Sequence, residues 1–149
     1  MPHAGLMDEK KLGPGEGPFL RARLHIRGGR RRLREGKIAA GIVTLYDAVL
    51  AAMDSYVASS NVRGTGIDTW GSEDIRNEKV LYNALVRSGV LDGRFDFGAF
   101  DRLAEHALAE EMQGYDYRDV LAGVESVMVQ LGVMPFDESL LPPEDPKTF

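Results

Sequence analysis

The chain has 149 residues, of which 44% are hydrophobic and 28% are charged, as in an ordinary globular domain with a core of its own. It has no cysteine, which excludes disulfides, thiolate metal sites and cysteine nucleophiles and suits a reducing compartment. The N-terminal residues lack the apolar run of a secretory signal, and no stretch reaches the roughly 18 apolar residues of a membrane span. We therefore expect a cytoplasmic protein that has no membrane partner.

The net charge of −5 conceals two regions of opposite sign. Residues 1–37 carry ten Lys and Arg against four Asp and Glu, which gives +6, whereas residues 38–149 carry eight against nineteen, which gives −11. A basic arm on an acidic body has two interpretations. The arm docks on the acidic surface of its own or a partner subunit, or it contacts a polyanion such as RNA.

The N-terminal part has an irregular start and then an alternating pattern. Residues 1–18 end in three glycines and two prolines within six positions, which predicts a flexible arm. From Leu20 to Arg27 apolar residues occupy every second position, which is the period of a strand. Because a lone strand is unstable, this segment either pairs with a second copy of the chain or forms a short helix or an extended arm. We expect Gly28-Gly29 to end it and residues 30–36 to begin the next helix, with Gly36 as a weak point.

The longest apolar pattern covers residues 37–58 and predicts the central helix of a bundle. One face carries apolar residues at steps of three or four, and an adjoining face is apolar as well, so both need covering. The first face consists of Ile38, Ile42, Leu45, Val49, Met53 and Tyr56, and the second of Ala39, Val43, Tyr46, Leu50 and Val57.

Three shorter helices are expected after the central one. The second runs from an N-cap at Ser72 to about Ser88, with Ile75, Leu81, Leu85 and Val86 buried and Gly89 as its stop. The third runs from Asp96 to about Met112, with a core face of Phe100, Leu103, Ala104, Ala107 and Leu108. The fourth runs from Tyr117 to Leu131, is capped by Asp116 and closed by Gly132, and buries Val120, Leu121, Val124, Val127, Met128 and Leu131.

Together these patterns predict an all-α, four-helix-bundle-like single domain with an extended N-terminal arm and C-terminal tail. The arm is residues 1–18, the helical domain is residues 19–132, and the proline-containing tail is residues 133–149. Leu140 and Leu141 are expected to let the tail lie across the bundle.

Six basic residues crowd into the eleven positions from Arg27 to Lys37. Guanidinium groups bind phosphate bidentately, so the possible polyanion patch consists of Arg30, Arg31, Arg32 and Arg34. The simpler interpretation is a solvated helix start or an arm that is ion-paired to the acidic body. It is favoured because no aromatic residue alternates with the arginines and the whole chain is acidic.

No other pattern predicts a cofactor or a metal. Gly64-Thr65-Gly66 lacks the further glycine of a dinucleotide fingerprint and the Gly-Lys-Ser/Thr of a phosphate loop. His106 and Glu110 share a helix face, but a metal needs ligands from a second segment as well. No serine has the context of a nucleophile.

The alanine-rich central helix and a later helix that opens with Arg76-Asn77 resemble the HEPN superfamily of small prokaryotic α-helical proteins. The resemblance covers residues 30–131. It implies an Arg followed by a His after four to six residues, placed at a dimer interface, and in the RNases of the family metal-independent RNA cleavage. Arg76, Asn77 and Tyr82 are the matching catalytic candidates here. Tyr82 stands where the family has His, and with an ordinary pKa near 10 it is a poor proton donor at neutral pH, which argues against RNase activity.

The sequence therefore favours a non-catalytic helical interaction module that acts through protein partners as a homodimer, with a second protein partner possible. The alternative is a HEPN-like RNA-binding protein or metal-independent RNase, and a small-molecule enzyme would lack an acid–base pair. The first two differ in whether Arg76, Arg102 or the arginines of residues 30–34 share a concave surface with a histidine.

Overall fold

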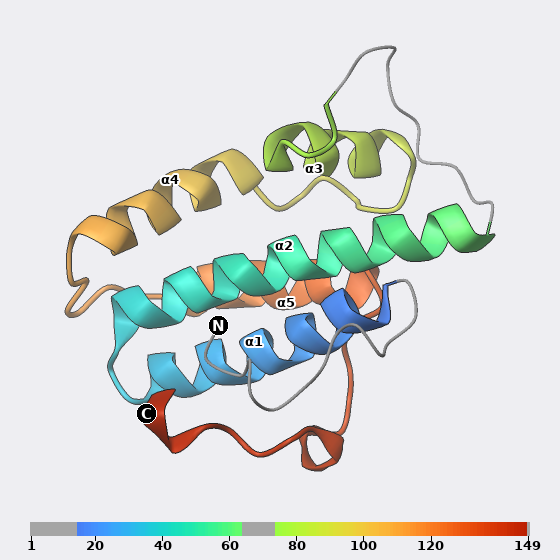
Figure 1. Cartoon of the computed structure of the whole chain (residues 1–149). Coiled ribbons are helices and arrows are strands. Elements are labelled where there is room, and N and C mark those ends of the chain that lie inside the picture. Colours follow the sequence, from blue (N-terminus) through green and yellow to red (C-terminus); the bar gives the residue numbers. More distant parts are fainter. Residues whose placement is uncertain (1–14, 64–73, 149) are drawn as a thin grey trace.

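The computed structural model describes residues 15–63 and 74–148, and within these residues it contains α-helices and two short 3-10 turns but no strand. The all-α prediction is confirmed (Figure 1). The helices are α1 (Glu16–Arg34), α2 (Ile38–Arg63), α3 (Glu78–Arg87), α4 (Phe97–Ala109) and α5 (Arg118–Gln130), followed in the tail by η2 (Glu138–Leu140) and η3 (Pro146–Thr148).

Helix α1 occupies the segment that was expected to be a strand, a short helix or an extended arm, and it runs through Gly28-Gly29 without a break. The strand alternative and the predicted break are therefore wrong. The glycines allow α1 and α2 to approach closely: a Cβ at Gly29 would lie 2.7 Å from Leu45 Cδ2, and one at Gly41 would lie 2.7 Å from Leu33 Cδ2. The interior glycines cost about 1 kcal/mol each in helix propensity, and the buried contact between the two helices offsets that cost.

The start of α1 also differs from the expected arm, because the helix begins at Glu16 and includes Pro18. Pro18 is the third residue of the helix, where a backbone N–H would have no partner inside the helix, so its missing N–H costs nothing there. The last residues assigned to the arm therefore belong to the bundle.

Gly36 ends α1 rather than lying inside a longer helix. It has a φ of +82°, its N–H donates to the Leu33 carbonyl, and the N–H of Lys37 donates to the Arg32 carbonyl. This pair of bonds is the Schellman arrangement, which favours glycine because the backbone is left-handed. Gly89 and Gly132 close α3 and α5 in the same way, as the sequence predicts.

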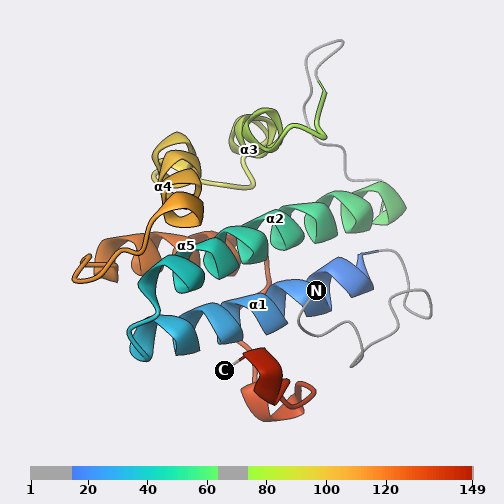
Figure 2. The same cartoon turned by 60° about the vertical axis from the view of Figure 1, so that its left-hand side comes forward.

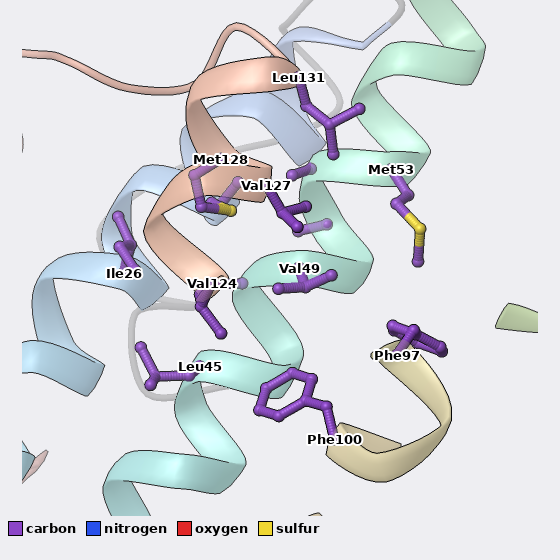
Figure 3. Close-up of a cluster of buried hydrophobic side chains, with 14 of the residues drawn as sticks. Ile26, Leu45, Val49, Met53, Phe97, Phe100, Val124, Val127, Met128 and Leu131 are labelled. Carbon is purple, nitrogen blue, oxygen red and sulfur yellow. The ribbon is translucent and has the colours of Figure 1, made fainter. Parts of the chain in front are cut away.

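Helix α2 is the central helix, and its first predicted face is buried. Leu45, Val49 and Met53 are fully buried, and Figure 3 shows them between α5 on one side and Phe97 and Phe100 of α4 on the other. Tyr56 and the second face are only partly buried. The first face is therefore buried except at Tyr56, whereas the second face is covered only in part.

The same helix meets a simple length and composition test for a membrane span. Ile38–Ser59 has a mean hydropathy of 1.4, which the sequence analysis did not anticipate. Half of this window is buried inside the bundle, and the core helix of a folded domain passes the same test. The composition of α2 is therefore only a weak indication of a membrane.

Helices α3 and α4 pack on the far side of α2 from α1 (Figures 1 and 2). Helix α3 begins five residues later than predicted, because Asn77 caps it by accepting from the backbone N–H groups of Lys79 and Val80. The proposed cap, Ser72, lies outside the described residues. Helix α4 starts next to Asp96, as predicted, and Asp96 is its N-cap, but the helix ends at Ala109 and Leu108 is 75% exposed rather than part of the core.

The tail follows α5 and returns along the side of α1 that faces away from α2 (Figures 1 and 2). Its packing does not rest on both predicted leucines, because Leu140 is 82% exposed and only Leu141 is partly buried. Val133 is fully buried, and Met134 and Phe136 pack against the core. The tail is therefore attached to the bundle at its first few residues and by the polar contacts described below.

Candidate functional site

Four arginines of α1 form a row on one face of the helix. Arg23, Arg27, Arg30 and Arg34 follow one another at steps of four, three and four residues, which places them on a single helical face. At 1.5 Å per residue the row is about 17 Å long. We call these four residues the arginine row. It contains Arg30 and Arg34 of the predicted polyanion patch.

The tail covers this row. The Nε of Arg23 donates to the carbonyl oxygen of Val133 at 3.1 Å, and its guanidinium lies 4.3 Å from the ring centre of Phe19 and 5.0 Å from that of Phe136. One turn of the helix beyond Arg27, Arg30 pairs with Glu138 of the tail and, at 3.3 Å, with Glu125 of α5. Two arginines of this face, Arg23 and Arg30, are thus covered by carboxylates, a backbone carbonyl and one aromatic ring of another segment.

The remaining arginines of the predicted patch have different surroundings. Arg31 donates from Nε to Glu144 of the tail at 3.0 Å and from a terminal nitrogen to Glu35 at 2.6 Å. The hydrogen bond from Arg31 lowers the pKa of the Glu35 carboxyl. Arg32 lies on the other side of the helix, where it donates to the Thr44 hydroxyl, and burial lowers the pKa of its guanidinium.

Between Arg23 and Arg30, Arg27 is the least compensated member of the row. Its Nε is buried and has no hydrogen-bond partner among the described residues. Arg34, at the end of the helix, is exposed. Two arginines of the row are therefore held by the tail, and two others lie on the same face outside the tail's ion pairs.

The residues matched to the HEPN motif lie at the start of α3, where they have local partners. The Arg76 side chain is 91% exposed and pairs with Asp74, with Nε to Oδ1 at 3.0 Å. Asn77 is the N-cap described above. The Tyr82 side chain is largely buried, and its hydroxyl donates to the carbonyl oxygen of Phe95 at 2.7 Å while its ring stacks on Phe97. Asn77 and Tyr82 thus hold α3, and Arg76 has only a local partner.

A cavity of about 480 Å³ lies beside Tyr82, between α3 and the loop that leads to α4. Its charged lining is mixed: Lys79 and Arg94 are cationic and Asp96 is anionic, and Lys79 is paired with Asp101 at 3.3 Å. Burial, together with the charges of Asp92 and Asp96, raises the pKa of Tyr82, so the hydroxyl stays protonated at neutral pH.

Two histidines lie within the described residues, on different helices. His106 is exposed on α4 and lies 3.5 Å from Glu110, whereas His25 is buried in α1. Arg102 is exposed on α4. Within residues 15–63 and 74–148 no group of three or more His, Asp or Glu side chains could hold a metal ion. The glycine loop at residues 64–66 lies outside the described residues.

A second surface feature is the apolar face of α2 that the other helices only partly cover. We call it the outer stripe, and it contains Ala39, Val43, Tyr46, Leu50 and Val57. The exposed carboxylates of Asp47 and Asp54 border it. On α4, Asp101 accepts a 2.6 Å hydrogen bond from the hydroxyl of Tyr46, so this edge of α4 borders the outer stripe. Leu108 lies seven residues, or about two helical turns, after Asp101 and therefore lies on the same edge of α4.

The sequence analysis missed Arg23 as a member of the row because it treated that segment as a possible strand. The spacing of Arg23, Arg27, Arg30 and Arg34 carries the helical signal and would have found the row. The ion pairs of Arg30 with Glu138 and of Arg31 with Glu144 could not be predicted from local sequence, since the partners lie 108 and 113 positions apart.

No protein-family model, no curated protein and no solved structure matches the chain.

Proposed function

We propose that this protein is a non-catalytic helical interaction module that acts through protein partners and associates as a homodimer in the cytoplasm. The observation that carries the proposal is the outer stripe of α2 with Leu108 beside it. Apolar side chains that continue along one helix face without full cover are typical of contact surfaces. A two-fold dimer is the commonest way in which a chain covers such a surface.

The basis of the proposal is narrower than the sequence alone suggested. Leu24 and Ile26 lie in the segment for which pairing with a second copy of the chain was one alternative, but both are buried within this chain. Leu140 remains exposed, on the tail. The argument for self-association therefore rests on the outer stripe of α2 and not on the segment that contains Leu24 and Ile26.

The local roles of the candidate catalytic groups support a non-catalytic function. Asn77 caps a helix, Tyr82 is held neutral, and Arg76 is paired with its neighbour Asp74. A second protein partner would need an apolar centre to meet the stripe and basic groups to meet Asp47 and Asp54.

Light scattering at micromolar concentration tests the homodimer directly. We expect a mass near twice the 16.4 kDa of one chain. Replacing two apolar residues of the surface, in the double variant Leu50→Gln/Leu108→Gln, is expected to return the mass to that of one chain. The matched control is Val129→Gln, which removes an exposed apolar side chain from α5 and should leave the dimer intact.

Far-UV circular dichroism accompanies each variant, so that a loss of association is not confused with unfolding. A wild-type mass of 16.4 kDa at these concentrations would refute the homodimer. Equal dissociation by the control would show that the contact lies elsewhere than the outer stripe.

The second candidate is a HEPN-like protein that binds or cleaves RNA, and the arginine row favours the binding part of it. We expect no RNA cleavage by the purified chain in the presence of EDTA, because the position of the family's His is occupied by the buried Tyr82. Cleavage that disappears in Arg76→Ala would contradict this expectation and promote the RNase.

A further inference from the structure

The arginine row has the geometry of a site for an extended polyanion. It presents four guanidinium groups along about 17 Å of one helix face. Guanidinium groups bind phosphate oxygens bidentately and stack on aromatic rings, and Phe19 lies beside Arg23 at one end of the row. This combination of a basic track and an aromatic ring is typical of single-stranded nucleic-acid sites.

The tail occupies the row with groups that imitate such a ligand. Phe136 stacks on the Arg23 guanidinium as a base would, and Glu138 meets Arg30 as a phosphate would. Glu144 then meets Arg31, on the flank of the row. Within residues 133–149 there are four acidic residues and one lysine, whereas α1 has seven arginines and one glutamate. The two segments are complementary in charge, and an aromatic ring and carboxylates follow each other along the tail.

The tail is held in a way that a competing polyanion can overcome. Its ion pairs are partly exposed: the side chains of Arg30 and Glu138 are 21% and 47% exposed, and those of Arg31 and Glu144 are 12% and 21% exposed. Such partly exposed pairs are individually weak and are screened by salt. Beyond Phe136 the tail contains only two three-residue turns, and Leu140 is exposed, so little apolar burial supports it.

We propose that the arginine row is a binding site for single-stranded nucleic acid and that the acidic tail covers it, so that nucleic acid and tail compete for the same arginines. This inference is independent of the proposed dimer, which uses the outer stripe of α2. It also reconciles the two interpretations of the basic region: the tail is the internal partner of the arginines, and a phosphate backbone is the external one. The chain's net charge of −5 opposes the binding of a polyanion whether or not the tail covers the row.

The test uses the full-length chain and two fluorescein-labelled probes, an oligouridylate and an oligothymidylate of about 20 nucleotides, which separate RNA from DNA as the ligand. The variant that releases the tail is Glu138→Gln/Glu144→Gln. Its matched control is Glu105→Gln/Glu111→Gln, which makes the same change in net charge at exposed positions of α4 and the following loop. Fluorescence anisotropy at about 50 mM salt then measures the affinity.

We expect the tail variant to bind about tenfold more tightly than the wild type and the control to change less than about twofold. Adding Arg27→Gln/Arg34→Gln to the tail variant removes two arginines that do not hold the tail. It should abolish the gain and make the dependence of log K on log salt shallower by about 1.4, since each phosphate contact on a single strand contributes about 0.7.

Hydrogen exchange of residues 133–147 reports whether the tail has been released. The backbone amides of Leu140 and Leu141 can be followed, because both donate hydrogen bonds within the tail. Faster exchange in the tail variant without tighter binding of either probe would overturn the proposal. Unchanged exchange would refute the premise that the ion pairs hold the tail. An equal gain in the tail variant and its control would show that net charge alone is responsible, and would also overturn it.

Discussion

The two sides of α2 are packed by different means. On the side of α1, glycines bring two backbones together, and the leucines Leu33 and Leu45 fill the space that the glycines leave. On the side of α4 and α3, aromatic rings separate the helices: Tyr46 lies 5.5 Å from Phe100, and Tyr82 lies 5.1 Å from Phe97, between ring centres. Small residues give a close contact in which shape sets the distance between the two helices.

The aromatic side depends on polar groups as well as on shape. The hydroxyl of Tyr46 donates to Asp101, and that of Tyr82 donates to the backbone of Phe95. A buried or partly buried tyrosine needs such an acceptor. Substitutions that change the size of a side chain should therefore lower the free energy of unfolding most on the α1 side of α2. Changes in protonation should lower it most on the α4 side.

The largest effect is expected at Leu45, which both sides share. It is fully buried, it fills the space beside Gly29, and it lies near Phe100 in the core (Figure 3). Leu45→Ala should lower the free energy of unfolding by about 2–5 kcal/mol through lost burial and a cavity. Denaturant titration measures this, and a loss below about 0.5 kcal/mol would place that face of α2 outside the core.

A smaller effect is expected from Gly41→Val, which tests the close approach of α1 and α2. A Cβ at this position would lie 3.2 Å from the backbone nitrogen of Leu33, so one helix has to move. We expect a loss of about 1–3 kcal/mol in the free energy of unfolding.

The control for this glycine is Gly98→Ala in α4. There the nearest described atom would be 3.5 Å from the new Cβ, which is an ordinary contact. Because alanine favours a helix by up to about 1 kcal/mol over glycine, this variant should be neutral or more stable. If Gly41→Val were equally neutral, the glycines would not be setting the distance between α1 and α2.

The smallest effect is expected from alkaline pH and is confined to the aromatic side. Burial raises the pKa of Tyr46, as does its hydrogen bond to the Asp101 carboxylate, and burial also raises the pKa of Tyr82. In the unfolded chain both tyrosines lose their protons near pH 10. Above that pH the unfolded state binds fewer protons than the folded one, so the free energy of unfolding should fall as the pH rises.

The wild type is compared with the double variant Tyr46→Phe/Tyr82→Phe, which lacks the two titrating hydroxyls. The variant should be less stable than the wild type at neutral pH, but its free energy of unfolding should fall less between about pH 9 and 11. Thermal or urea denaturation across this range measures the difference. An identical slope for the wild type and the double variant would mean that other groups cause the alkaline loss.

The sequence predicts the parts of the fold whose signals are local. The buried face of α2 follows from apolar spacing, and the ends of α3 and α5 follow from Gly89 and Gly132. Helix α1 was ambiguous because arginines and apolar residues alternate along it, which imitates a strand, and because Gly28-Gly29 looks like a break until α2 is packed against it. Tertiary contact decided the conformation there, not local preference.

The candidate site was partly predictable for the same reason. The arginines of residues 30–34 were singled out from composition, and their pairing with the chain's own acidic residues was one of two stated interpretations. Which acidic residues take part could not be inferred, since Arg30 meets Glu125 and Glu138 from distant parts of the chain. The outer stripe was visible as an apolar pattern, but its partial exposure depends on where α3 and α4 pack.

The long sequence separation between α1 and the tail has a consequence for the newly made chain. The contact between Arg32 and Thr44 joins residues 12 positions apart, so the pair of helices α1 and α2 can close early. The contact between Arg31 and Glu144 joins residues 113 positions apart. At about 5–20 residues per second, a ribosome needs roughly 6–23 s to add that stretch. During this interval the arginines of α1 have been synthesised and their acidic cover has not, so a polyanion near the ribosome meets them without a competitor.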